Sequence, residues 1–133
     1  MQKGIFVVFD GNDGSGKATQ SDMLASHFAA AGHPHQKFDF PAYGRSFFGT
    51  FLGECLAGQH GDFLNLSPRI ASTLYAADRH EASDAIRDAL AEGKVVIADR
   101  FASSNQIHQG GKIADERERI DFLGWLDRME HEV

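Results

Sequence analysis

Residues 11–17, GNDGSGK, have the composition of a loop that binds phosphate groups. The apolar run 5–9 precedes them, so this part of the chain predicts a strand, a tight loop and then a helix. Glycine adopts positive φ at little cost, which lets a loop backbone wrap around an anion. Loop amides and a helix N-terminus attract phosphate, and Lys17 can reach the β- and γ-phosphates of a nucleoside triphosphate. The residues expected to hold it are Gly11, Asn12, Asp13, Gly14, Ser15, Gly16, Lys17, Ala18 and Thr19.

The loop departs from the common GxxxxGK[ST] pattern directly after the lysine. A serine or threonine hydroxyl binds Mg²⁺ at that position, whereas this chain has Ala18, with Thr19 one residue later. A glycine-rich turn without a ligand is the plain alternative, although the strand–loop–helix context favours phosphate binding. A dinucleotide-binding GxGxxG motif starting at Gly14 would need glycine where Thr19 stands.

Asp99 follows the apolar run 95–98, as the Walker B aspartate of a nucleotide-binding protein does. We expect it to hold Mg²⁺ directly or through water, because phosphoryl transfer requires the ion at the β- and γ-oxygens. Since Ala18 offers no hydroxyl, Asp99 and Asp10, or water, must supply more of the coordination. The alternative for Asp99 is a strand-end residue that caps the next turn.

Two arginines and two aromatic residues are candidates for nucleotide contacts. Arg79 and Arg100 could bind phosphate or a base, since a guanidinium group matches phosphate in a two-pronged way. Arg79 follows Asp78 within a predicted helix, however, and such pairs usually lie on a solvated face. Tyr75 and Phe40 could stack on a base, although aromatic side chains more often belong to the core.

The order of the predicted elements indicates an α/β fold with a parallel sheet and right-handed crossovers. Helical spacing places Met23 and Phe28 on one face of the first helix. Because ligands of such folds sit beyond the carboxyl ends of the strands, the segments Gly11–Lys17, Pro41–Arg45 and Asp99–Gln109 should meet at one cleft. The strands are expected at about 5–10, 35–40 and 95–99, and the helices at about 17–31, 47–56, 68–92 and 115–131.

Length and charge narrow the class of protein. The 133 residues suit one domain, expected to span 1–133, and the net charge of −6 argues against bulk binding to nucleic acid or to an anionic membrane. A nucleotide substrate remains compatible, because its phosphates meet local donors. The single Cys55 cannot form an internal disulfide, which points to a reducing cytoplasm. We expect no signal peptide and no membrane span.

Four segments resemble the thymidylate kinase family. The loop is similar to the family's GxDGxGKxTQ pattern, and FPAYG at 40–44 is similar to its FPxY segment. ASTLYAADRHEAS at 71–83 resembles the family's nucleotide-site helix, and ADRFASSNQIHQG at 98–110 resembles its DRYxxSxxAYQG signature. The resemblance implies a P-loop NTPase-type α/β/α fold, truncated here to about three strands. It also implies a homodimer that transfers a phosphoryl group from ATP to dTMP with Mg²⁺, giving dTDP and ADP.

The resemblance also implies roles for single residues. Lys17 would hold the ATP phosphates, Asp13 would approach the sugar hydroxyl of dTMP, and Arg100 would help to hold the monophosphate. Tyr75 would stack on thymine, and Arg79 would contact the base. The other residues expected around dTMP are Phe40, Pro41, Arg45, Ser104 and Gln109.

Several positions depart from the family's pattern. Ala42 stands where related FPRY segments have arginine, and Arg45 is the candidate replacement. Gly14 occupies the place where one branch of the family has a catalytic arginine, a charge that the other branch supplies from a later lid. Phe101 and His108 stand where tyrosines are usual.

The family's lid and its later strands have no counterpart in these 133 residues, so we expect the N-terminal portion of a larger enzyme. It could be a fragment, the ordered portion of a longer chain, or one half of a split protein. The strand at 5–10, central in the family, would then be an edge that invites pairing with another chain. Two other functions remain open, a nucleotide-binding module without turnover and a regulatory NTPase switch.

Overall fold

Parallel strands β1 (Ile5–Phe9), β2 (His35–Asp39) and β3 (Val95–Asp99) form the sheet of this computed structural model, which describes residues 3–12 and 14–132. Within that part of the chain the strand order is β1-β3-β2, with Val7 and Lys37 both paired to Ile97. The three predicted strands are confirmed to within one residue at their ends. The prediction that the first strand becomes an edge is confirmed too.

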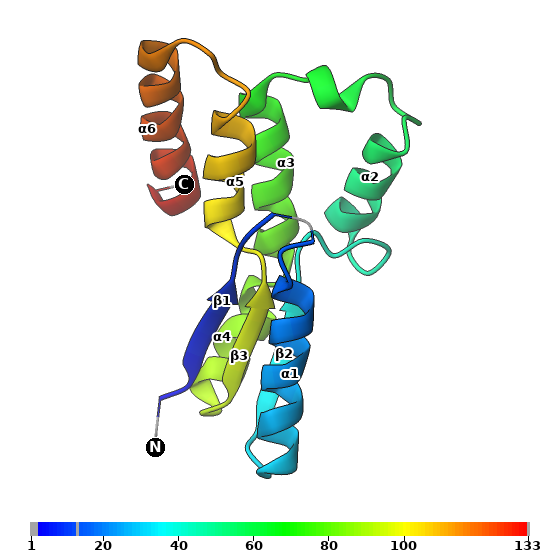
Figure 1. The fold of residues 1–133 in the computed structure, drawn as a ribbon, viewed down its shortest axis with the longest axis vertical. Coiled ribbons are helices and arrows are strands. Elements are labelled where there is room, and N and C mark those ends of the chain that lie inside the picture. Colours follow the sequence, from blue (N-terminus) through cyan, green and yellow to red (C-terminus); the bar gives the residue numbers. More distant parts are fainter. Residues whose placement is uncertain (1–2, 13, 133) are drawn as a thin grey trace. The chain divides into compact units, whose positions relative to one another are not determined.

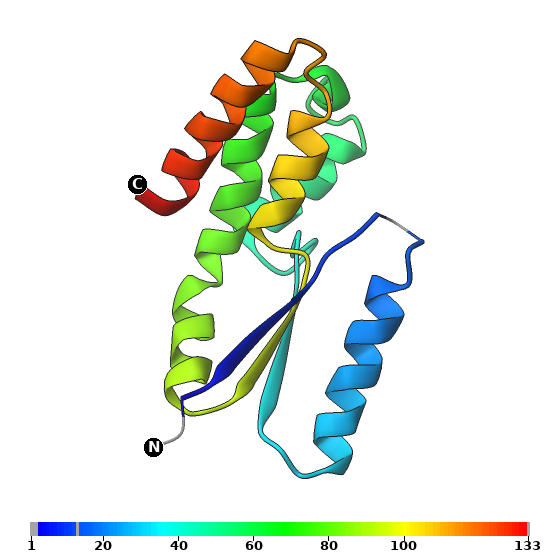
Figure 2. The same ribbon diagram turned by 60° about the vertical axis from the view of Figure 1, so that its left-hand side comes forward.

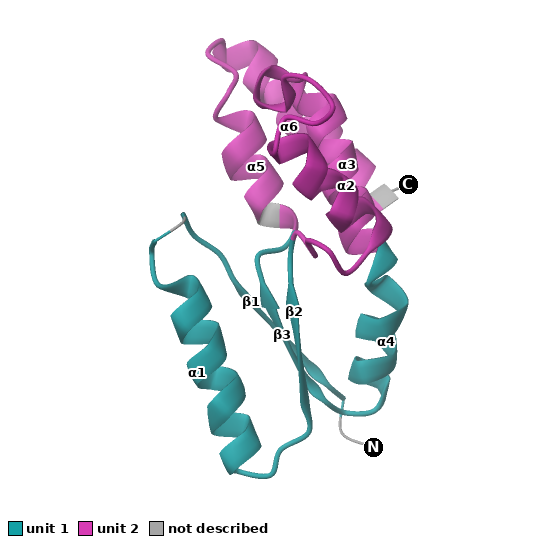
Figure 3. Cartoon of the chain, turned by 90° about the vertical axis from the view of Figure 1, so that its right-hand side faces the viewer, with its two compact units in different colours: residues 1–40, 81–101 teal, residues 41–80, 102–133 magenta. Residues whose placement is uncertain are grey.

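The chain divides into two compact units, which are described separately (Figure 3). Unit 1 comprises residues 1–40 and 81–101, and unit 2 comprises residues 41–80 and 102–133. Unit 1 contains the sheet together with α1 (Lys17–Ala30) and α4 (Ser83–Ala91). The prediction of one domain over 1–133 stays a prediction.

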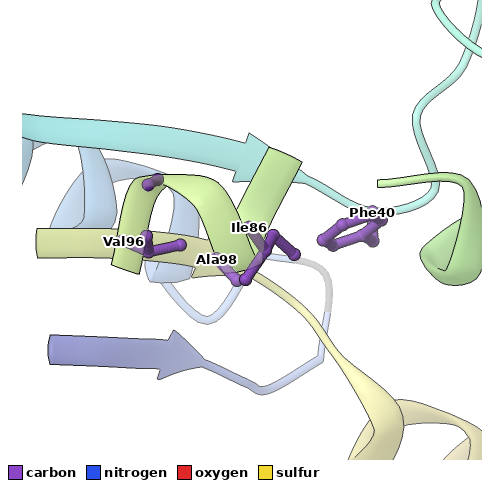
Figure 4. Close-up of a cluster of buried hydrophobic side chains, with 5 residues drawn as sticks. Phe40, Ile86, Val96 and Ala98 are labelled. Carbon is purple, nitrogen blue, oxygen red and sulfur yellow. The ribbon is translucent and has the colours of Figure 1, made fainter. Parts of the chain in front are cut away.

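The core of unit 1 lies around the central strand. Helices α1 and α4 cover opposite faces of the sheet (Figure 2), so the side chains of β3 are buried on both sides, as parallel sheets require. Figure 4 shows the cluster between β3 and α4. Its buried members are Phe40, Ile86, Ala89, Val96 and Ala98.

The edge strand β1 is covered much less than its neighbour. Ile5 is 57% exposed and Val8 39%, whereas Val96 and Ile97 are fully buried. On α1, Met23 is 60% exposed, although helical spacing places it on the same face as the half-buried Phe28. The N-terminal segment therefore has more apolar side chains than the described residues cover.

A salt bridge joins α1 to β2 in unit 1. Lys37 of β2 pairs with Asp22 of α1 and lies 3.3 Å from Asp39. Burial opposes the charged form of Lys37, but hydrogen bonds to the two carboxylates outweigh burial and raise the pKa of Lys37 above its ordinary value. Lys37 consequently stays charged throughout the neutral range.

Unit 2 is helical. It contains α2 (Phe47–Leu56), the 3-10 turn η1 (Phe63–Asn65), most of α3 (Pro68–Glu81), α5 (Ala102–Gly110) and α6 (Glu116–Glu132). Helices α3, α5 and α6 lie side by side (Figure 1). Its buried apolar residues are Leu52, Cys55, Phe63, Ala71, Phe122 and Leu126. None of the helices described is long and apolar enough to cross a membrane.

One helix prediction was wrong, and one helix was not predicted. The helix expected over 68–92 is interrupted at Ala82, whose ψ of −4° departs from helical values, so that α3 and α4 are separate helices. The sequence has no glycine or proline there, and the interruption comes where the chain passes from the core of unit 2 to that of unit 1. Residues 102–110, expected only as a polar segment after a strand, form α5.

Gly49 in α2 is required by packing, and we expect Gly49→Ala to destabilise the chain by about 1–3 kcal/mol. An added Cβ would lie 2.1 Å from the carbonyl oxygen of Ala42, which is backbone and cannot move aside cheaply. Gly53→Ala in the same helix is the matched control, because its Cβ would meet Tyr43 at an ordinary 3.5 Å. We expect that control to gain up to about 1 kcal/mol from helix propensity. Equal loss in both variants, measured by urea unfolding, would contradict the packing argument.

Candidate functional site

The glycine-rich loop joins β1 to α1 in the conformation that its sequence predicts. Gly11, Gly14 and Gly16 have φ of 152°, 78° and 90°. A Cβ at Gly14 or Gly16 would meet no atom within 4 Å, so backbone conformation, rather than lack of space, requires glycine there. Asp13, expected in both nucleotide sites, lies outside the described residues.

Among the described residues, the N-terminus of α1 has no acidic or capping side chain. Gly16 is its N-cap, no side chain of the described residues is seen to cap the first turn, and that turn contains no acidic residue. First-turn amides have no partner within their own helix, and their dipoles favour an anion. The start of α1 is therefore suited to a phosphate group.

Lys17 and Asp99 come together at one end of the sheet in unit 1. Lys17 Nζ lies 3.9 Å from Asp99 Oδ1, and their side chains are only 12% and 14% exposed. Asp99 Oδ1 is buried and has no hydrogen-bond partner among the described residues. An unsatisfied buried carboxylate oxygen is costly, so this atom suits a cation or an ordered water molecule.

The two carboxylates expected at the metal differ in their surroundings. Asp10 is exposed, and its Oδ1 accepts a hydrogen bond of 2.9 Å from the amide of Gly11. No group of three or more histidine, cysteine or acidic side chains suited to a metal occurs among the residues described. A divalent ion held by Asp99 would therefore complete its shell with phosphate oxygens and water, as Mg²⁺ commonly does.

Arg100 is a non-glycine residue in left-handed conformation, with φ of 67°. Its amide donates to the carbonyl of Phe9 at 2.8 Å, which fixes the end of β3 against β1. Such a conformation costs about 1–2 kcal/mol for an L-residue and is concentrated at functional sites. The chain thus bends directly after Asp99, where a ligand-binding turn is expected.

Arg79 is buried in unit 2, contrary to the expectation of a solvated pair. Arg79 is 7% exposed and Asp78 1%. The Arg79 guanidinium forms an ion pair with Glu130 of α6. Asn105 of α5 donates both to Glu130 Oε1 and to the Ser72 carbonyl, each at 3.0 Å. This network joins α3, α5 and α6 through buried polar groups.

The remaining residues expected around dTMP are distributed over both units. Phe40 lies in the core of unit 1, with its ring 5.8 Å from that of Phe101. In unit 2, Tyr75 is half-buried beside Phe63, and Arg45 is exposed in the segment before α2. Gln109 of α5 is 4% exposed, and its Oε1 has no hydrogen-bond partner in the part of the chain described. Pro41 and Ser104 are both half-buried in unit 2.

Sequence reasoning missed three polar residues in the interior of unit 2. Asp78, Asn105 and Glu130 were assigned no role, yet each has buried hydrogen bonds or ion pairs in unit 2. A signal was present for Asp78, because helical spacing places it on the same face as Ala71, a buried residue seven positions earlier. No comparable sequence signal singles out Glu130.

Comparison with known proteins identifies relatives of similar sequence. The family model described as thymidylate kinase matches residues 9–120. Thymidylate kinase of Clavibacter sepedonicus is 36% identical over 92% of this chain and 56% of its own length. That of Mycobacterium tuberculosis is 32% identical over 95% and 58%. The chain thus spans little more than half the length of these curated relatives.

A solved structure supports the fold. The thymidylate kinase of Candida albicans superposes with a TM-score of 0.78 at 24% identity, covering 96% of this chain and 57% of that one. The parallel three-stranded sheet and its helices therefore form a truncated α/β fold of the P-loop NTPase type. This confirms the predicted fold class.

Proposed function

The chain belongs to the thymidylate kinase family, and we propose that it transfers the γ-phosphoryl group of ATP to dTMP, giving dTDP and ADP for dTTP synthesis. The observation that supports this most strongly is the pairing of Lys17 with the partly unsatisfied Asp99 beside a positive-φ glycine loop. Loop, lysine and strand-end carboxylate are the parts that hold a triphosphate in P-loop enzymes.

The proposed reaction needs positioning and charge neutralisation, without a covalent enzyme intermediate. Amides of residues 11–19 would bind the ATP phosphates, and the Lys17 ammonium would neutralise the β- and γ-oxygens. Arg100, held in its bent backbone conformation, would bind the monophosphate of the acceptor. Asp13 would contact the acceptor's sugar hydroxyl.

The acceptor would lie against residues of α3 and α5. Tyr75 would stack on thymine, while Arg79, Ser104 and Gln109 would contact its edge. The Arg79 ion pair with Glu130 is compatible with this role, since a guanidinium group has five N–H donors. The charge of Arg45 would assist at the phosphate, and Phe40 and Pro41 would shape the pocket.

Mg²⁺ is proposed as the cofactor, and Asp99, directly or through water, and Asp10 would hold it. When bound, the ion neutralises charge on the β- and γ-phosphates. We expect Asp99→Asn to weaken Mg²⁺-dependent ATP binding by about 10- to 100-fold, the range found when groups that support a metal are lost. Calorimetric titration with ATP, with and without Mg²⁺, measures this. Asp88→Asn, an exposed change of the same type on α4, is the control. Equal ATP affinities of wild type and Asp99→Asn in Mg²⁺ would exclude Asp99 from the metal site.

A coupled assay for ADP release tests the proposed function. We expect ADP to form when ATP, Mg²⁺ and dTMP are all present, and not with ATP alone. The second candidate is a binding module without turnover, favoured by Ala18 and Gly14, which remove a metal-binding hydroxyl and a catalytic charge. Calorimetric binding of dTMP without ADP release would favour that candidate.

Two further properties are proposed from the family resemblance. A homodimer is expected, as is usual in the family, and light scattering would measure it. A cytoplasmic location is supported by the single cysteine, Cys55, which is buried and free.

A further inference from the structure

We propose that Asp78 is a positioning residue that fixes the turn formed by residues 42–46 to helix α3 and so sets the affinity for the acceptor's phosphate. This inference rests on the proposed function, because the acceptor is taken to be dTMP. All the contacts that support it lie within unit 2.

The Asp78 carboxylate is buried, with 1% of the residue exposed, and it binds both ends of the turn. Its Oδ2 and Oδ1 accept from the Ala42 amide at 3.1 and 3.3 Å. Oδ1 also accepts from the hydroxyl of Ser46 at 2.9 Å. The turn itself is closed by the Arg45 amide, which donates to the Ala42 carbonyl at 3.0 Å.

Ser46 extends the same connection into α2. It is the N-cap of that helix, and its Oγ accepts from the Gly49 amide at 2.9 Å. One buried carboxylate therefore holds the turn, the start of α2 and helix α3 in a fixed relation. Hydrogen bonds to an ionised group are roughly twice as strong as neutral ones.

Movement of the turn away from α3 is unfavourable for a physical reason. It would take the Ala42 and Ser46 donors away from the buried Asp78 carboxylate, and losing donors to a buried acceptor costs about 1–3 kcal/mol, more when the acceptor is charged. The tip of the turn, by contrast, is open to solvent. Tyr43 is 49% exposed, and Gly44 and Arg45 are exposed as well.

By fixing residues 42 and 46, the Asp78 carboxylate also fixes where Arg45 lies relative to α3. Tyr75 and Arg79, the residues proposed to bind thymine, lie three residues before and one residue after Asp78 on that helix. The Asp78 carboxylate therefore sets the distance between Arg45 and the side chains proposed to bind the base. An anionic phosphate at a fixed distance from the base is the group that such an arrangement recognises.

The test compares the affinities of Asp78→Ala and Ser46→Ala for dTMP, thymidine and ATP by calorimetry. We expect Asp78→Ala to bind dTMP at least 10-fold more weakly and thymidine, which has no phosphate, less than 3-fold more weakly. ATP affinity should stay within 2-fold of wild type. Asp84→Ala is the control, since this carboxylate is 90% exposed on α4 and pairs only at the surface with Arg87.

Ser46→Ala keeps the proposal testable if Asp78→Ala does not fold. It removes one of the turn's attachments to Asp78 and should weaken dTMP binding about 3-fold, again more than thymidine binding. A purely structural role would lower the melting temperature and leave the ratio of dTMP to thymidine affinity unchanged, which would overturn the proposal. Absence of dTMP binding by the wild-type chain would overturn the proposed function and this role together. Wild-type binding with unchanged variant ratios would overturn this role alone.

Discussion

Lys17→Ala is expected to lower the rate of ATP-dependent dTMP phosphorylation by about 100- to 1,000-fold, the usual effect of removing one preorganised charge-stabilising donor. The Lys17 ammonium lies at the start of α1 beside Asp99, where the phosphates of ATP are proposed to bind. Without it, the charge that develops on the transferred phosphoryl group has one fewer compensating cation. The rate of ADP release at saturating dTMP measures the effect.

The control for Lys17 is Lys112→Ala. Lys112 is exposed between α5 and α6, so its loss changes the net charge equally without touching the loop. We expect less than a 2-fold change in rate for this control. A Lys17→Ala variant as active as the control would show that the loop does not hold ATP during the reaction.

Arg79→Ala is expected to destabilise the chain by about 3–5 kcal/mol, because the substitution leaves Glu130 buried without its charged partner. The side chains of this ion pair are 8% and 9% exposed, and of the donors described to Glu130 Oε1 the neutral Asn105 would remain. Glu130→Ala should have a comparable effect for the reverse reason. Urea unfolding monitored by Trp125 fluorescence measures both variants.

An exposed pair supplies the control for the Arg79 prediction. Arg87 and Asp84 lie 2.9 Å apart, but their side chains are 70% and 90% exposed. Arg87→Ala should therefore cost less than about 1 kcal/mol. The double variant Arg79→Met/Glu130→Leu should recover most of the lost stability and none of the dTMP affinity. Equal costs for Arg79→Ala and Arg87→Ala would contradict the buried-network account.

The backbone of the glycine-rich loop could be predicted from sequence because it depends on local rules. Gly11, Gly14 and Gly16 all adopt the positive φ for which glycine is suited, and the flanking strand and helix begin and end within a residue of the expected positions. A short apolar run, a glycine cluster and a lysine specify this geometry without help from the rest of the chain.

Unit 2 was harder to predict because its polar residues are placed by tertiary contacts. The Asp78–Arg79 pair was expected on a solvated face, yet it faces the turn at Ala42 and the Glu130 carboxylate. Charged residues are seldom fully buried unless paired, and partners 36 and 51 positions away are invisible to local patterns. The interruption at Ala82 has the same origin, since α3 and α4 belong largely to different cores.

We propose above all that the loop at Lys17 holds ATP while its γ-phosphoryl group passes to a thymidine nucleotide. Incubation with ATP labelled at the γ-phosphate, Mg²⁺ and dTMP, followed by chromatographic separation of the nucleotides, tests it directly. We expect the label to appear in dTDP with the wild type and not with Lys17→Ala. Label that remains in ATP, or that is released only as inorganic phosphate, would contradict it.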